Sequence, residues 1–216
     1  MLTWEQTLDR YEAAFGIRPG VGPDSERVGY LESLWTYCRN LLPKPAIVIE
    51  IGCFRGKSTA IMALALKGTG SRIITIDPVF ATGEFSCSDP CPEGRTTYSS
   101  SIRNVLNRWA LMGISSMISV VPLDSNSALA TWDGTVCDMV LVDGNHSSWA
   151  VTQDSEWSRY LNVGALMCYD DWISEVRASA LLYFADKPQF ELIYESTSPP
   201  PDGHPQWAIT LFRRCQ

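Results

Sequence analysis

The chain has 216 residues, of which 45% are hydrophobic, and this is enough for one domain with a full layered core. Its net charge is -7 and its Lys and Arg residues are scattered, which argues against nucleic acid and against an anionic membrane surface as partners. We find no signal-peptide pattern at the amino terminus, and no stretch with the roughly 20 apolar residues of a membrane span.

The seven cysteines are an odd number spread along the chain, which predicts reduced thiols in a cytoplasmic protein. Cys53, Cys137 and Cys168 lie in or beside apolar runs, so we expect them to be buried. Cys87 and Cys91 form a lone CxxxC pair in a polar segment. A zinc site needs a second pair of ligands, so a surface loop is favoured there over a metal site.

Two amphipathic helices are expected first, at about 3–15 and 25–42, with the breaker-rich segment 16–23 between them. Pro43 and Pro45 end the second helix. These helices form an amino-terminal extension over residues 1–45 of a single domain, 1–216. The extension carries Trp4 and Trp35, which could form the surface of a homo-oligomer.

From residue 46 to the end of the chain, 46–216, apolar strands alternate with helices. We expect strands at 46–51, 72–76, 118–122, 139–142 and 165–169, and helices at 57–66, 101–112, 125–132, 148–161 and 172–185. Strands that are apolar on both faces and joined by helices predict a mostly parallel sheet covered on both sides, a doubly wound Rossmann-like α/β fold. Two strands without a helix between them, at 190–194 and 207–212, predict a closing antiparallel pair.

The segment 78–100 is too long for a plain connection and is rich in Gly, Ser, Pro and Cys. In a compact domain such a segment is usually a functional lid or a disordered loop, and we favour a lid on the substrate side.

A glycine-bearing turn follows the first strand. Gly52 and Gly56 let the backbone approach a ligand closely, and the helix that begins near residue 57, with Ser58 in its first turn, directs free amides at an anionic group. Asp77 ends the next strand, where a carboxylate commonly binds the hydroxyl pair of a ribose. Gly52, Gly56, Ser58 and Asp77 are therefore candidate cofactor-binding residues.

The same features would suit a nicotinamide cofactor, but two details favour S-adenosylmethionine. The spacing is Glu-x-Gly-x-x-x-Gly rather than Gly-x-Gly-x-x-Gly, and Glu50 precedes the turn, where it could order the loop or reach the cationic methionine part. Asp124 and Ser125 follow the third strand, where adenine is usually held. The alternative for Asp124 is an ordinary helix N-cap.

Carboxylates also follow two later strands: Asp143 with His146 close behind it, and the pair Asp170 and Asp171. Two carboxylates about 4 Å apart repel by roughly 4 kcal/mol at an effective dielectric of 20, so three held together favour a bound cation. Magnesium prefers such oxygen ligands. The alternative is that Asp170 and Asp171 cap the following helix. His146 could act as a base, as a metal ligand or as a structural hydrogen-bond donor.

Together these motifs resemble class I S-adenosylmethionine-dependent methyltransferases, especially the branch of macrocin-type O-methyltransferases and cephalosporin-hydroxylase-like proteins. The resemblance spans about 46–213 and implies a seven-stranded sheet with an antiparallel last strand. It also implies that Asp143, Asp170 and Asp171 bind magnesium and that His146 is the general base. The sequence departs from the family at Asn145, where some relatives carry an acidic base, and at Gly164, which is followed by Ala rather than Gly.

The sequence thus predicts a magnesium-dependent O-methyltransferase of a small hydroxylated molecule, a natural-product sugar or phenol, with His146 and Asp143 as catalytic residues. One alternative is a hydroxylase-like enzyme with the same fold. Another is a non-catalytic S-adenosylmethionine-binding protein. Trp149 and Trp172 flank the site and could contact a substrate ring or pack in the core. Asp154, in the following helix, could support the site or lie on a solvated helix face.

Overall fold

The computed structural model describes residues 2–19, 28–82, 84–87, 98–170, 174–195 and 209–216. Its centre is a seven-stranded sheet in the order β5-β2-β1-β6-β7-β9-β8. The strands are β1 (Ile47–Ile51), β2 (Arg72–Ile76), β5 (Ile118–Val121), β6 (Cys137–Val142), β7 (Leu161–Tyr169), β8 (Phe190–Glu195) and β9 (Thr210–Arg214). The neighbouring strands from β5 to β7 pair in parallel, whereas β9 is antiparallel to both β7 and β8. The predicted mostly parallel sheet with an antiparallel last strand is confirmed.

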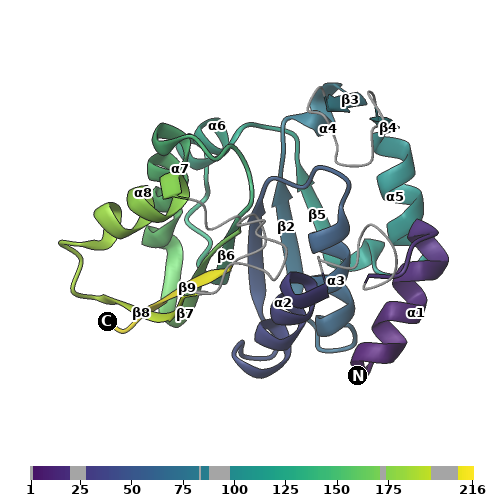
Figure 1. Ribbon diagram of the computed structural model, residues 1–216, viewed down its shortest axis with the longest axis horizontal. Coiled ribbons are helices and arrows are strands. Elements are labelled where there is room, and N and C mark those ends of the chain that lie inside the picture. The colour runs from purple at the N-terminus through teal and green to yellow at the C-terminus, as the bar shows by residue number, and fades with distance from the viewer. Residues whose placement is uncertain (1, 20–27, 83, 88–97, 171–173, 196–208) are drawn as a thin grey trace.

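Helices cover both faces of this sheet (Figure 1). One face packs against α1 (Trp4–Phe15), α2 (Val28–Asn40), α3 (Lys57–Leu66) and α5 (Ile102–Leu111). The other face packs against α6 (Ser125–Ala130), α7 (Ser148–Ser155) and α8 (Ser174–Phe184). Successive side chains of β6 point to opposite faces of the sheet and so pack in different cores. Leu141, for example, lies in the first core and Val142 in the second. Every residue of α3 from Ser58 to Leu66 is buried.

The predicted bounds of α3 and β2 match the structure, but those of the segment before β7 do not. The helix predicted at 148–161 is α-helical only to Ser155 and continues as the 3₁₀ helix η3 (Glu156–Tyr160). β7 then begins at Leu161, earlier than predicted. Gly164, with φ of +86°, interrupts the apolar pattern inside this strand. The sequence pattern therefore predicts a strand only after Gly164. A second 3₁₀ helix, η2 (Ser115–Met117), precedes β5.

The segment 78–100 contains secondary structure that the sequence did not suggest. It holds α4 (Val79–Thr82) and the strands β3 (Glu84–Cys87) and β4 (Tyr98–Ser101), which form a separate antiparallel pair. Cys91 lies outside the described residues, and the lid function of the segment stays a prediction. The expected burial of Cys53, Cys137 and Cys168 is confirmed.

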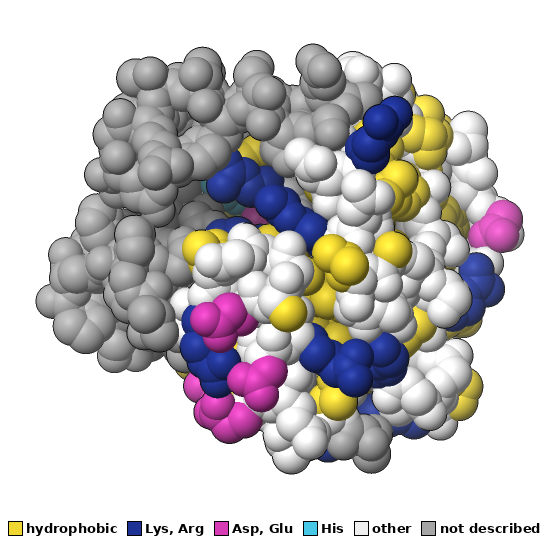
Figure 2. All heavy atoms as spheres, turned by 90° about the vertical axis from the view of Figure 1, so that its right-hand side faces the viewer, with side chains coloured by type: hydrophobic (Ala, Val, Ile, Leu, Met, Phe, Trp, Pro, Cys, Tyr) yellow, Lys and Arg dark blue, Asp and Glu magenta, His cyan; other side chains and the backbone are white. Residues whose placement is uncertain are grey.

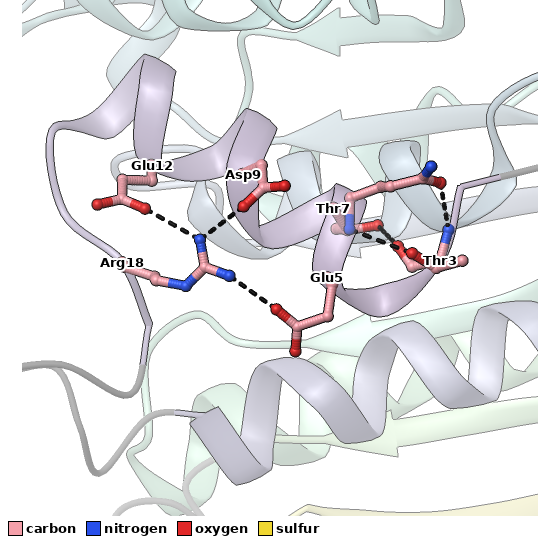
Figure 3. Close-up of polar contacts among 7 residues, drawn as sticks. Thr3, Glu5, Thr7, Asp9, Glu12 and Arg18 are labelled. Carbon is pink, nitrogen blue, oxygen red and sulfur yellow. Dashed lines mark hydrogen bonds and ion pairs between the residues drawn. The ribbon is translucent and has the colours of Figure 1, made fainter.

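The amino-terminal helix α1 is fixed at both ends. Thr3 and Gln6 form a reciprocal capping box at its start. After its end, Arg18 contacts the carboxylates of Glu5, Asp9 and Glu12 at 2.7, 2.7 and 3.0 Å, respectively (Figure 3). Each of these exposed ion pairs contributes little to stability. Together they hold the segment that follows α1 against the side of this helix.

Helix α1 also contacts α2 through two pairs of side chains. The indole N–H of Trp35 donates a hydrogen bond to Thr7 Oγ1 at 3.1 Å, and the rings of Trp4 and Trp35 lie 5.8 Å apart. Both tryptophans are partly buried and pack against the core, so homo-oligomer formation through them stays a prediction. The side of the molecule with α1 and α5 instead exposes Leu106 and Leu111 of α5, and Figure 2 shows hydrophobic side chains among Lys and Arg side chains on this side. None of the helices in the described part of the chain is both long and apolar enough to cross a membrane.

Candidate active site

The carboxyl ends of four adjacent parallel strands bring four of the candidate residues into one row. In the sheet register, Ile51 lies between Ile76 and Val142, and Val142 lies beside Tyr169. The residues that follow these four strands are Asp77, Gly52, Asp143 and Asp170. Backbone hydrogen bonds hold the row together: Gly52 N to Ile76 O at 3.0 Å, Asp143 N to Ile51 O at 2.8 Å and Asp170 N to Val142 O at 3.0 Å.

This row crosses the boundary between β1 and β6, where the strand order of the sheet reverses. Ligands of open α/β sheets bind in the crevice outside the carboxyl ends of the strands at such a switch point. The row is therefore where the fold itself predicts a binding site.

The glycines of the first turn are required by both conformation and space. Gly52 has φ of +88°, and a Cβ atom there would lie 2.1 Å from the backbone oxygen of Asp143 and 2.9 Å from the Cα of Gly144. Gly56 has φ of +71°, and a Cβ atom there would lie 2.8 Å from the indole nitrogen of Trp109. The glycine turn and the loop after Asp143 are therefore packed backbone against backbone.

Glu50 is fully buried beneath this turn. Its two carboxylate oxygens accept hydrogen bonds from the hydroxyls of Ser58 at 2.6 Å and Thr59 at 2.5 Å. Burial raises the pKa of Glu50 to about 6, although hydrogen bonds from Ser58, Thr59 and Thr75 oppose this rise. The contacts fit the loop-ordering alternative for Glu50, because they tie β1 to the first turn of α3. Direct cofactor contacts of Glu50 and Ser58 stay predictions.

Asp77 shapes the same turn from the neighbouring strand. Its Oδ2 accepts hydrogen bonds from the backbone N–H groups of Cys53 at 2.8 Å and Phe54 at 2.9 Å, and its Oδ1 accepts one from Val79 N at 2.9 Å. Phe54 has φ of +46°, a left-handed conformation that is uncommon for a bulky residue. Asp77 thus holds the turn in a strained conformation, and its ribose contact stays a prediction.

Asp124 and Ser125 lie at the same edge, after β5. Asp124 is the N-cap of α6 and accepts hydrogen bonds from the backbone N–H of Ser127 at 3.0 Å and from its hydroxyl at 2.7 Å, which lower the pKa of Asp124. The N-cap alternative is therefore present in the structure. Ser125 Oγ accepts a hydrogen bond from the indole N–H of Trp157 at 2.8 Å. Contacts of both residues with adenine stay predictions.

Asp143 and Asp170 follow neighbouring strands, and Asp170 is only 9% exposed. His146 lies partly buried in the loop after Asp143, where Asn145 Oδ1 accepts a hydrogen bond from Ser147 N at 2.9 Å. Ser147 then caps α7. The described part of the chain holds no group of three His, Cys, Asp or Glu side chains placed to bind a metal. The third predicted ligand, Asp171, and the flanking Trp172 lie outside the described residues, so the set of three is not tested.

Sequence reasoning missed Tyr30 and left Asp154 undecided. The hydroxyl of Tyr30, on α2, donates a hydrogen bond to Asp143 Oδ2 at 3.4 Å. Asp154 is 5% exposed, so the solvated helix face considered for it is wrong. Its Oδ2 lies 3.7 Å from the position that a Cβ atom on Gly144 would take. Burial raises the pKa of Asp154 to about 6, and hydrogen bonding from Ser125 opposes this.

Trp149 follows His146 closely in the chain, in the first turn of α7. Its side chain is 67% exposed, so the core-packing alternative for this residue is wrong. The exposed ring is therefore accessible to a ligand, and its contact with substrate stays a prediction.

Solved structures with the same fold include several methyltransferases. The O-methyltransferase TomG from Streptomyces achromogenes, described as involved in tomaymycin synthesis and in complex with SAM, has 16% identity over 100% of this chain and 92% of its own, with a TM-score of 0.63. Cofactor-bound Rv0187 from MTB has 16% identity over 97% and 88%, with a TM-score of 0.59. The SAM-dependent O-methyltransferase TM0748 from Thermotoga maritima has 11% identity over 97% and 71%, with a TM-score of 0.60.

No curated protein matches the sequence. At the identities above, the solved structures show the fold alone. A family model described as a methyltransferase domain matches residues 49–172, more than half of the chain, from β1 to just beyond β7. The matched range includes the whole row from Gly52 to Asp170, and it confirms the resemblance to methyltransferases. The chain belongs to this methyltransferase-domain family.

Proposed function

We propose that this methyltransferase uses S-adenosylmethionine and a divalent cation, with magnesium preferred, to methylate a hydroxyl group of a small molecule. The observation that carries the proposal is the row of Asp77, Gly52, Asp143 and Asp170 across the switch point of the sheet. The row has a glycine turn on one side and, on the other, two aspartates that follow adjacent strands. It can therefore serve a methyl donor and a hydroxyl acceptor at one edge of the sheet.

The methyl donor belongs on the side of β1 and β2. S-adenosylmethionine, when bound, supplies a methyl group on a positively charged sulfur. The chain offers it the amino-terminal end of α3, the carboxylate of Asp77 for the ribose hydroxyls, and Asp124 with Ser125 for the adenine. Glu50 orders the glycine turn by accepting hydrogen bonds from the hydroxyls of Ser58 and Thr59. The SAM complex of TomG, which has the same fold, supports this choice of cofactor.

The acceptor belongs on the side of β6 and β7. A neutral alcohol is a poor nucleophile near pH 7 and must lose a proton during transfer, and His146 is the residue that we assign to accept it. Asp143 and Asp170 present carboxylate oxygens from adjacent strands, the ligand type that magnesium prefers, and we assign Asp171 as the third ligand. A divalent cation held there would lower the pKa of a hydroxyl bound to it.

The acceptor that we propose is a natural-product sugar or phenol in the cytoplasm. The exposed ring of Trp149, near His146 in the chain, supports a ring-shaped acceptor, because aromatic side chains stack on planar rings and on the apolar faces of sugars. TomG, an O-methyltransferase of the same fold that is described as involved in tomaymycin synthesis, supports a small-molecule acceptor.

Calorimetry and a transfer assay test the proposal together. S-adenosylmethionine should bind the purified protein with and without EDTA, whereas methyl transfer to a panel of phenols and sugars should stop in EDTA and return with added Mg²⁺. Transfer that continues undiminished in EDTA would contradict the metal role. Binding without transfer to any acceptor would favour the non-catalytic alternative, and preference for a nicotinamide cofactor would refute the choice of cofactor.

A further inference from the structure

We propose that Tyr30, on the amino-terminal helix α2, is a positioning residue of the active site, whose hydroxyl orients the carboxylate of Asp143. This inference rests on the proposed function, because it assigns Tyr30 to the side of the row that holds the cation. The family model begins only at residue 49, so it gives no role to this helix.

The contact joins two distant parts of the chain. The hydroxyl of Tyr30 donates to Asp143 Oδ2 at 3.4 Å, which is a long hydrogen bond. Tyr30 is only 8% exposed, so little water can compete for the contact. In surroundings of low polarity a hydrogen bond to a charged oxygen is stronger than the same bond in water. A neutral phenol donor can therefore restrict the rotation of the Asp143 carboxylate without cancelling its charge.

The helix that carries Tyr30 is well fixed. Leu31 and Leu34, which follow Tyr30 on α2, are 3% and 0% exposed in the core between this helix, α3 and the sheet. Farther along α2, the indole of Trp35 donates its hydrogen bond to Thr7 of α1. Because α2 is held on both sides, the tyrosine hydroxyl is presented to Asp143 from a rigid element rather than from a loop.

The effect of this contact should appear in metal affinity. Groups that hydrogen-bond to a metal ligand fix its orientation, and their loss typically lowers metal affinity by about 10- to 100-fold. Tyr30→Phe removes only the hydroxyl and keeps the ring in the core. The cofactor side of the row is untouched by the change, so affinity for S-adenosylmethionine should stay the same.

The test measures binding of Mn²⁺, as a probe for the divalent cation, by calorimetry on the full chain. Tyr30→Phe should raise the Kd for Mn²⁺ at least about tenfold, with the Kd for S-adenosylmethionine changed less than about twofold. Tyr37→Phe is the matched control, because it removes a hydroxyl from the same helix at a ring that packs near Tyr194. This control should leave the Kd for Mn²⁺ unchanged.

A double variant separates the loss of carboxylate orientation at Asp143 from a general loss of structure. In an Asp143→Asn background, Tyr30→Phe should cause no further loss of Mn²⁺ affinity, because the carboxylate that it orients is gone. An unchanged Kd in Tyr30→Phe, with normal binding by the wild type, would overturn the role of Tyr30 and leave the proposed function intact. A wild type that binds no Mn²⁺ would overturn the metal part of the proposed function and this inference with it.

Discussion

Replacing Gly52 by alanine should damage both the stability and the site, because two separate costs meet at this residue. The backbone has φ of +88°, which an alanine adopts at a cost of roughly 1–2 kcal/mol. The new Cβ would also lie 2.1 Å from the backbone oxygen of Asp143, so the two loops must separate. Forced overpacking of this kind costs a further 1–3 kcal/mol or so.

Gly134 offers a matched control. Its φ is +87°, almost the same as that of Gly52, but a Cβ atom there would meet no heavy atom within 4 Å. Gly134→Ala should therefore incur only the conformational cost, about 1–2 kcal/mol. The difference in free energy of unfolding between the two variants therefore measures the cost of crowding between the glycine turn and the Asp143 loop.

Urea unfolding at one pH gives the free energy of unfolding of each variant. We expect Gly52→Ala to be destabilised by about 1–3 kcal/mol more than Gly134→Ala. We also expect Gly52→Ala to bind S-adenosylmethionine and Mn²⁺ more weakly, whereas Gly134→Ala should bind both normally. Equal destabilisation of the two variants within about 0.5 kcal/mol, or normal ligand binding by Gly52→Ala, would refute the reasoning from this contact.

Three further predictions concern single side chains. The pKa of Glu50 is raised from 4.5 to about 6 in the folded protein, so it contributes about 2 kcal/mol of stability below pH 4.5 that is lost as the pH rises through 6. In urea unfolding, the wild type should lose more stability between pH 4.5 and 7 than Glu50→Gln does, by most of that amount. Equal losses in the two proteins would contradict the raised pKa of Glu50. Asp77→Asn weakens the acceptor for the N–H groups of Cys53 and Phe54. In calorimetry it should raise the Kd for S-adenosylmethionine at least about tenfold. An unchanged Kd would exclude Asp77 from the cofactor site. His146→Ala should lower kcat by about 10²- to 10⁴-fold, and a rate within a few-fold of the wild type across the pH range would remove it as the base.

The fold could be predicted because its pattern is local and repeated. Most strands of the seven-stranded sheet contain a short apolar run, and most helices have clear breakers at their ends. The bounds of α3 and β2 therefore match the structure. The pair β3 and β4 was missed because four of its eight residues are serine, a residue common in turns and loops. Pairing between strands, not local preference, decides their conformation.

The site could be predicted only in part. Parallel strands place their following residues at one edge, so the adjacency of Asp143 and Asp170 follows from the topology. The contact between Tyr30 and Asp143 does not, because an amphipathic pattern shows that a helix packs but not which distant residue its polar atoms meet. Asp154 was ambiguous for a related reason: its helix α7 has apolar and polar residues on all sides, so the pattern gives no buried face.

A crystal structure with S-adenosylhomocysteine and Mg²⁺ would test the central claim most directly. The account predicts that the ribose lies beside Asp77, that the homocysteine part lies over the turn from Gly52 to Gly56, and that Mg²⁺ is bound by oxygens of Asp143 and Asp170. A nucleoside bound away from this edge of the sheet, or Mg²⁺ bound without either carboxylate, would contradict it.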